Sequence, residues 1–253
     1  MEKLDLTTPS FEQKCLANKV ILITGAGSGI GRTLALAAAG AGATTILVGK
    51  SLKKLESLYD EIMEKGYPEP AIHPINLLLI KPEDAQVLAS SIQQMFGRLD
   101  GLVHNAGISG PITPLEHLSP EKWQQVLHLN LNVPYLLTHA LLPLLKQANA
   151  SSIIFITAME AIKAKAYWSA YSASKWGVVG LAQALHQELE DNTQVRVNCI
   201  NPGIVRTAMR VNAYPGIEPS EFTAPEEIMP QYLYLLSDES KDINGKWVNV
   251  SLN

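Results

Sequence analysis

The stretch KVILITGAGSGIGRTLALAAAGAG, residues 19 to 42, indicates the fold class of this 253-residue chain. It opens with a nearly continuous apolar run, which is typical of a strand buried on both faces. A glycine-rich turn, Gly25-x-x-x-Gly29-x-Gly31, then leads into an alanine-rich helix. Glycines allow a tight turn and close backbone approach, and a helix N-terminus offers free N–H groups and a positive dipole end. This strand, turn and helix therefore predict a phosphate-binding site.

Strand-like runs recur along the rest of the chain, and helix-length segments separate them. Such alternation implies parallel crossovers, with helices covering both faces of a sheet. We therefore predict a single-domain α/β Rossmann fold with a doubly wound, seven-stranded parallel sheet. No linker or repeat divides residues 1–253, and residues 1–18 are expected to form an N-terminal extension. The further predicted strands are residues 43–49, 71–75, 100–104, 152–157, 195–200 and 246–250.

The composition favours small-molecule chemistry. A formal net charge of −4 and the lack of a dense Lys/Arg run argue against a nucleic-acid surface or an anionic-membrane anchor. No apolar run reaches membrane-spanning length, and residues 1–14 hold no apolar core of signal-peptide length. Cys15 and Cys199 are too few and too scattered for a disulfide framework or a metal site. We expect a cytoplasmic protein that binds no metal, membrane or nucleic acid.

Residues 206 to 224 form the longest stretch without a clear regular pattern. They follow the predicted strand at 195–200. In an open α/β sheet, ligands bind in the crevice at the carboxyl ends of the strands. A surface loop and a lid over that crevice are both consistent with this position. We take the segment as a candidate substrate lid.

Several ordered motifs resemble those of the short-chain dehydrogenase/reductase family. They are TGAGSGIG at 24–31, HNAG at 104–107, YSASK at 171–175 and NPGIVRTAM at 201–209. The resemblance runs from Lys19 to the C-terminus, and PEEIMPQYLYLL at 225–236 adds a likeness to the YciK-like oxidoreductases of bacteria. It implies hydride transfer between a nicotinamide cofactor and a small carbonyl or alcohol substrate. It also implies a homodimer or homotetramer.

The resemblance assigns a catalytic set. Tyr171 and Lys175, at i and i+4, lie on one helix face. Tyr171 would be the general acid in carbonyl reduction, and Lys175 would hold the nicotinamide ribose and stabilise the phenolate. Because a neighbouring cation favours the charged form of Tyr, we expect the pKa of Tyr171 to be lowered. Asn130 would hold a proton-relay water; capping a bend before Pro134 is the alternative reason for an Asn there, and the nearby Asn132 is not assigned this role.

The resemblance also implies a cofactor site. Asn105, Ala106 and Gly107 would flank the adenosine side and support the sheet, while Asn76 would lie near adenine. Pro202, Gly203 and the backbone near Ile204 would lie beside the nicotinamide, with Thr207 on its carboxamide or on the phosphate. With the glycine turn and the next strand, the predicted cofactor-binding set is Thr24, Gly25, Ser28, Gly29, Ile30, Gly31, Lys50, Ser51, Asn76, Asn105, Ala106, Gly107, Lys175, Pro202, Gly203, Ile204 and Thr207.

The residues after the second predicted strand favour NADP(H) over NAD(H). An NAD enzyme would place an Asp or Glu there to bind the ribose hydroxyls. The sequence has Gly49, Lys50 and Ser51 instead. A cation and a hydroxyl suit a 2′-phosphate.

One position departs from the family pattern. The family's catalytic Ser, thirteen residues before the Tyr, is Ala158 here. Thr157 is adjacent, but successive strand side chains point to opposite faces. Three interpretations stay open: a weakened reductase, a site in which another hydroxyl substitutes, or an NADP(H)-binding sensor or scaffold that no longer catalyses. A Rossmann methyltransferase would share the glycine turn but does not account for YSASK. Glu160 is expected to face water.

Overall fold

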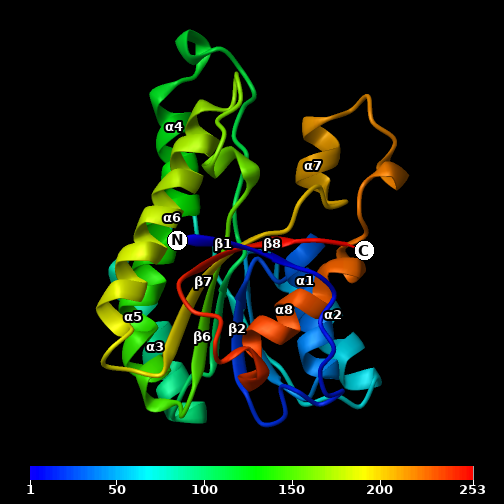
Figure 1. The fold of residues 1–253 in the computed structure, drawn as a ribbon, viewed down its shortest axis with the longest axis vertical. Helices are drawn as coiled ribbons and strands as arrows, with labels where there is room; N and C mark the ends of the chain where they lie inside the picture. The colour runs from blue at the N-terminus through cyan, green and yellow to red at the C-terminus, as the bar shows by residue number, and fades with distance from the viewer. Residues whose placement is uncertain (253) are drawn as a thin grey trace.

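The computed structural model describes residues 1–252 and contains a parallel sheet in the order β1-β8-β7-β6-β5-β2-β3-β4. The predicted fold class is confirmed: one α/β domain with helices on both faces of the sheet (Figure 1). Each predicted strand is present to within a residue or two at its ends. The bounds are β1 Glu2–Leu6, β2 Val20–Thr24, β3 Thr44–Gly49, β4 Ala71–Pro74, β5 Gly101–His104, β6 Ser151–Ile156, β7 Val195–Asn201 and β8 Lys246–Val250.

The described sheet has eight strands, so the predicted number of seven was one too few. The additional strand, β1, lies in the segment that we expected to be an irregular extension. It pairs with β8 at the edge of the sheet, from Glu2 opposite Lys246 to Leu6 opposite Val250. Its sequence EKLDL alternates charged and apolar residues and is mostly exposed. An edge strand of this kind lacks the continuous apolar run that identifies the buried strands.

The helices form two layers that enclose the sheet (Figure 1). On one face, α1, α2 and α8 share a core cluster with β2, β3 and β7. On the other face, α3, α5 and α6 share a second cluster, and α4 packs on α6. The bounds are α1 Gly29–Gly40, α2 Leu52–Glu64, α3 Pro82–Phe96, α4 Pro120–Leu127, α5 Val133–Gln147, α6 Ser169–Leu189, α7 Ala208–Ala213 and α8 Met229–Leu236. Among residues 1–252, no helix combines the length and the apolar character needed to cross a membrane.

Short helical turns complete the structure, and two of them matter for the site. A π-helical turn, η2 (His128–Asn132), joins α4 to α5, and the 3₁₀ turn η3 (Met159–Ala161) follows β6. The other 3₁₀ turns are η1 (Leu115–His117), η4 (Pro219–Glu221), η5 (Pro225–Ile228) and η6 (Asp238–Ser240).

The strand order places a crevice between β2 and β5. From β2 the chain proceeds through β3 to β4 at one edge, returns to β5 beside β2, and then proceeds towards the other edge. The connections after β2 and β5 therefore leave the sheet in opposite directions. This is the position at which open α/β sheets bind ligands.

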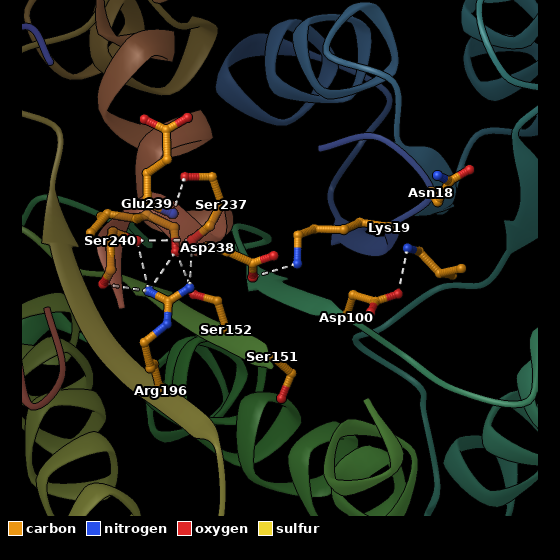
Figure 2. A network of polar contacts seen from close by, with 12 residues as sticks. Asn18, Lys19, Asp100, Ser151, Ser152, Arg196, Ser237, Asp238, Glu239 and Ser240 are labelled. Carbon is orange, nitrogen blue, oxygen red and sulfur yellow. Dashed lines mark hydrogen bonds and ion pairs between the residues drawn. The ribbon is translucent and has the colours of Figure 1, made fainter. Parts of the chain in front are cut away.

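A buried arginine on β7 joins the sheet to the C-terminal end of α8 (Figure 2). Arg196 on β7 is 6% exposed, and its guanidinium donates hydrogen bonds to the carbonyl oxygens of Leu235, Ser237 and Ser240. It also donates to the Ser240 hydroxyl over 2.8 Å. Helix C-termini leave carbonyl groups without intrahelical partners, and a cation there is favourable. Arg196 therefore satisfies the end of α8 from within the sheet.

We predict that Arg196→Met lowers the free energy of unfolding by about 2 to 4 kcal/mol, because hydrogen bonds to a charged group are lost and buried carbonyls stay unpaired. Urea unfolding measures this change. Arg206→Met is the matched control, since Arg206 is exposed and surface substitutions usually stay within about 0.5 kcal/mol. Equal effects of the two substitutions would contradict the role assigned to Arg196.

Candidate active site

A cavity of about 970 Å³ lies at the carboxyl ends of the central strands. Its walls come from the glycine turn after β2, the ends of β3, β5 and β6, the first turns of α6, and α7. Much of the predicted set therefore lies around one space. The predicted residues that line it are Gly25, Ser28, Gly29, Ile30, Lys50, Ser51, Asn76, Asn105, Ala106, Gly107, Tyr171, Lys175, Pro202, Gly203 and Thr207.

The glycines of the first turn have separate structural reasons. Gly25 and Gly29 have φ of 69° and 54°, backbone angles that residues with a side chain rarely adopt. Gly31 has an ordinary φ, but a Cβ there would lie 2.4 Å from both the Asn105 Nδ2 atom and the Gly25 carbonyl oxygen. Gly31 therefore allows α1 to pack closely against the turn. It does not line the cavity.

The turns after β2 and β5 are bonded to each other. The backbone N–H groups of Asn105 and Ala106 both donate to the Thr24 hydroxyl over 3.0 Å, and that hydroxyl donates to the Val103 carbonyl. The Asn105 amide donates to the Thr24 carbonyl over 2.8 Å. The hydroxyl and the carbonyl of Thr24 therefore have their hydrogen-bond partners within the protein. Thr24 is buried and does not line the cavity. Its position supports a structural role in place of the predicted cofactor contact.

Ile204 also lies outside the cavity wall, although Pro202 and Gly203 line it. Its side chain is 58% exposed. The prediction concerned its backbone, which pairs with Thr223: the Thr223 N–H donates to the Ile204 carbonyl over 3.1 Å. That carbonyl is therefore used within the chain.

Asn130 lies behind the cavity wall in the π turn η2 and is 2% exposed. Its Oδ1 accepts from the Ile108 N–H, and its Nδ2 donates to the Ile108 carbonyl, both over 2.9 Å. Nδ2 also donates to the Ser174 hydroxyl, which donates to the Tyr171 carbonyl. Both amide hydrogens are therefore used within the protein. The side chain fixes the segment after Gly107 to the helix that carries Tyr171.

Tyr171 and Lys175 lie on one face of α6, as predicted. The Lys175 ammonium is 5.6 Å from the centre of the Tyr171 ring and donates to the Ile156 carbonyl over 2.7 Å. Burial lowers the pKa of Lys175 to about 8. Burial also raises the pKa of Tyr171, with a smaller contribution from the Glu160 carboxylate. The expected lowering of the Tyr171 pKa is therefore wrong for this structure, because the desolvation of the phenolate outweighs the nearby positive charges.

Glu160 was expected to face water, and this expectation is also wrong. Its side chain is 8% exposed in η3, which packs against α6, and its Oε2 has no hydrogen-bond partner among the described residues. A turn residue next to exposed Met159 gives no sequence signal of burial. The burial arises only from the packing of η3 on α6.

Ala158 and Thr157 both line the cavity at the end of β6. Ala158 packs with Trp168 and Tyr171 in a small cluster. Thr157 is 2% exposed, and its hydroxyl has no partner within residues 1–252. A buried unpaired hydroxyl costs free energy. The wall beside Tyr171 therefore holds a methyl group at Ala158, with an unused hydroxyl one residue away.

The far end of the cavity is cationic. Lys50 and Lys54 line it, are exposed, and form no ion pair with any described residue. The sequence analysis did not identify Lys54, because the helix SLKKLESLYDEIMEK is charged along its length. Its position in the first turn of that helix, directly after Lys50 and Ser51, is the signal that could have identified it. Asn76 also lines this end, and its Oδ1 accepts from the Leu78 N–H.

The segment expected to be a lid leaves the sheet through a narrow neck. Val205 and Thr223 form a β-bridge, and the Arg206 N–H donates to the Thr223 carbonyl over 2.8 Å. Beyond the neck lies the short helix α7, which begins at a Thr207 cap and projects past the strand ends (Figure 1). Thr207 also lies against the glycine turn, since a Cβ on Gly29 would be 3.2 Å from its methyl group. Of this segment, Thr207 and most of α7 line one side of the cavity.

The geometry agrees with comparisons to known proteins. The family model for short chain dehydrogenases matches residues 19–217. The chain belongs to the short-chain dehydrogenase family. This short-chain dehydrogenase is 41% identical to the uncharacterized oxidoreductase YciK of Escherichia coli K12, over 92% of each chain. It is therefore an oxidoreductase of a family that acts on alcohol and carbonyl groups and binds a nicotinamide cofactor.

Solved structures extend the likeness of this short-chain dehydrogenase. A protein assigned as a short chain dehydrogenase from Pseudomonas syringae is 45% identical, with a TM-score of 0.94 over 96% of this chain and 98% of the other. A protein with the same assignment from E. coli CFT073, in complex with NADPH, is 40% identical. Its TM-score is 0.91 over 94% of this chain and 99% of the other.

We predict that Gly31→Ala weakens NADPH binding at least about tenfold, because overpacking against backbone atoms costs about 1 to 3 kcal/mol. Calorimetry measures the affinity. Gly180→Ala is the matched control, since a Cβ on this α6 glycine meets nothing within 4 Å. It should leave binding unchanged and raise the melting temperature slightly, as Ala favours helices over Gly. Identical behaviour of the two variants would refute the packing role of Gly31.

Proposed function

We propose that the protein is an NADP(H)-dependent reductase or dehydrogenase of a small carbonyl or alcohol substrate. The observation that carries the proposal is that Tyr171 and Lys175 line the same cavity as the N-terminal glycine turn of α1. A proton donor and a phosphate-binding turn are thereby joined in one space.

The residues present fit the cofactor. Positive-φ glycines leave the backbone of the first turn open, and the N-terminus of α1 presents N–H groups to a pyrophosphate. Lys50, Lys54 and Ser51 would hold the 2′-phosphate, and Asn76 would face the adenine. The segment from Pro202 to Thr207 would hold the nicotinamide end. When bound, NADP(H) supplies or accepts the hydride.

The chain supplies the proton. The Tyr171 hydroxyl is protonated at neutral pH and can donate its proton to the carbonyl oxygen in reduction. Burial raises the pKa of Tyr171 and so makes it a weaker acid, and the positive charge of Arg210 opposes this rise. Lys175 lies over the Tyr171 ring and would stabilise the phenolate after transfer. The Asn130 amide hydrogens are occupied, so a water relay through this residue would use its main-chain carbonyl. The π turn supports this, because such turns disrupt the regular helical bonding.

Ala158 leaves this proton-transfer site without a hydrogen-bond donor that the reaction would use. A Ser at this position would donate a hydrogen bond to the substrate oxygen as negative charge develops, and one such donor is worth about 10² to 10³ in rate. Thr157 has a free buried hydroxyl, but Ala158 is the residue that packs against Tyr171. We infer a reductase with reduced rate. A catalytically weak NADP(H)-binding sensor or scaffold is the second candidate, and Ala158 is the observation that favours it.

Three further expectations remain proposals. Residues 206–224 would act as the substrate lid, since α7 lines one side of the cavity. A homodimer or homotetramer is supported by large apolar side chains exposed on α5 and α6, with Tyr135 at 51% and Trp176 at 53%. A cytoplasmic location is consistent with two unpaired cysteines.

We predict that the protein binds NADPH at least about tenfold more tightly than NADH, since one charge-assisted phosphate contact is worth about 1.5 to 3 kcal/mol. Lys50→Ala should remove most of that preference, and Lys54→Ala part of it, while NADH binding stays nearly unchanged. Calorimetry with both cofactors measures this. Equal affinities in the wild type would contradict the prediction, and a parallel loss of both cofactors in Lys50→Ala would assign that residue a structural role.

We predict that Ala158→Ser raises kcat/KM on an accepted carbonyl by about tenfold or more, because it restores a donor beside Tyr171. The measurement is the rate of NADPH oxidation. Thr157→Val is the matched variant and should change kcat/KM little; a collapse in Thr157→Val would show that its hydroxyl has taken over the role of the Ser. Turnover that survives Tyr171→Phe would refute the assigned chemistry. Tight NADPH binding without turnover in every variant would favour the sensor or scaffold.

A further inference from the structure

The charged side chains that line the cavity are all cationic, and one of them has no role assigned so far. Four cationic side chains line it, Lys50, Lys54, Lys175 and Arg210, and none of the lining residues is an Asp or Glu. The proposed function assigns two of these cations to the 2′-phosphate and Lys175 to the ribose and the phenolate. Arg210 is left without a part in holding the cofactor.

A row of aromatic rings places Arg210 at the Tyr171 end of the cavity. Its guanidinium lies 5.3 Å from the centre of the Tyr214 ring. Tyr214 stacks on Trp168 at 6.0 Å, and Trp168 meets Tyr171 edge-on at 5.5 Å. Lys165 fixes the row from outside by donating to the Tyr214 hydroxyl over 2.8 Å. The guanidinium also acts on Tyr171 directly, since it opposes the rise in the Tyr171 pKa caused by burial.

The Arg210 guanidinium has no acidic partner among the described residues. The carboxylate of Glu160 also influences Tyr171, but Glu160 does not line the cavity and forms no ion pair with Arg210. An anion inside the cavity would therefore meet the cation and not the carboxylate. A half-buried guanidinium with its five donors uncommitted favours such a group, because Arg binds carboxylates and phosphates through two parallel hydrogen bonds.

The remaining wall at this end is apolar. Ile112, Ala158, Trp168, Met209 and Ala213 line it. A substrate that fits would present its carbonyl to Tyr171, a short apolar body to this wall, and a negative group to α7. Neutral polyhydroxyl compounds would leave the wall without apolar contacts and the guanidinium without a partner.

We propose that Arg210 is a specificity-determining residue that binds a negatively charged group of the substrate, so that this enzyme selects carbonyl or alcohol compounds bearing a carboxylate or a phosphate. This inference rests on the proposed function, since it assigns the substrate end of the same cavity. It also gives α7 a part in recognition, because the anion would bridge the lid to the chemistry at Tyr171.

The first experiment compares charged substrates with neutral partners of similar size. The pairs are 4-oxopentanoate with its methyl ester, and dihydroxyacetone phosphate with dihydroxyacetone, so that the two anion types are distinguished. We expect kcat/KM to favour the charged member of at least one pair by about tenfold or more, the worth of one charge-assisted hydrogen bond. Arg210→Met should abolish that preference, and Arg210→Lys should retain part of it. Arg206→Met is the control and should keep the preference, since Arg206 is exposed and does not line the cavity.

The second experiment measures binding, so that it does not depend on turnover. Calorimetry compares hexanoate with hexanamide on the wild type and on both Arg variants, with and without saturating NADPH. We expect hexanoate to bind the wild type at least about tenfold more tightly than hexanamide, and this difference to disappear in Arg210→Met. NADPH affinity should stay unchanged in that variant.

The outcomes separate this inference from the proposed function. Hexanoate selectivity that depends on Arg210, together with no turnover of any carbonyl, would retain the inference and refute the reductase. Equal binding of hexanoate and hexanamide by the wild type would overturn the inference, as would selectivity that survives Arg210→Met. A marked loss of NADPH affinity in Arg210→Met would also overturn it, because the guanidinium would then belong to the cofactor site.

Discussion

The hydroxyl of Thr24 holds together the two strand ends on which the site depends. It accepts from two consecutive N–H groups after β5 and donates back to Val103, while the Asn105 amide bonds the Thr24 carbonyl. The glycine turn and the start of α1 are therefore fixed to the segment after β5. That segment is fixed in turn through Ile108 to Asn130, and through Ser174 to the backbone of Tyr171. The phosphate end and the proton-donor end of the cavity share one hydrogen-bonded frame.

The central strands were predictable from the sequence because they are rich in Val, Ile and Leu, and their ends follow from the turns that bound them. The glycine turn and the Tyr171–Lys175 pair were predictable for a related reason, since short spacings fix their local geometry. β1 was missed because an edge strand carries charges and lacks a continuous apolar run. The helix α7 was missed because it spans only six residues, Ala208–Ala213, and is followed closely by Pro215 and Gly216.

Features that depend on packing between distant segments could not be read from the sequence. Glu160 is buried because η3 lies on α6, and nothing in the letters AMEAI indicates that contact. The pKa of Tyr171 rises because the first turns of α6 are enclosed, so the cost of desolvating a phenolate outweighs the opposing positive charge of Arg210. Thr24 and Asn130 were assigned to ligand contacts, yet their side chains are used mainly to hold the backbone. The motifs predicted residues that lie around one cavity, but the sequence did not indicate which of their side chains hold the backbone.

The bridge between Val205 and Thr223 has a consequence for how such a protein can diversify. The two ends of the intervening segment are held together at the sheet, so its entropy of closure changes little when its length changes. Insertions or deletions after α7, beyond the residues that contact the glycine turn and line the cavity, would leave β7 and the α1 turn undisturbed. That part of the segment can therefore vary in length and sequence as a unit. A change in the length of that part would reshape the surface beside the cavity while the sheet stays constant.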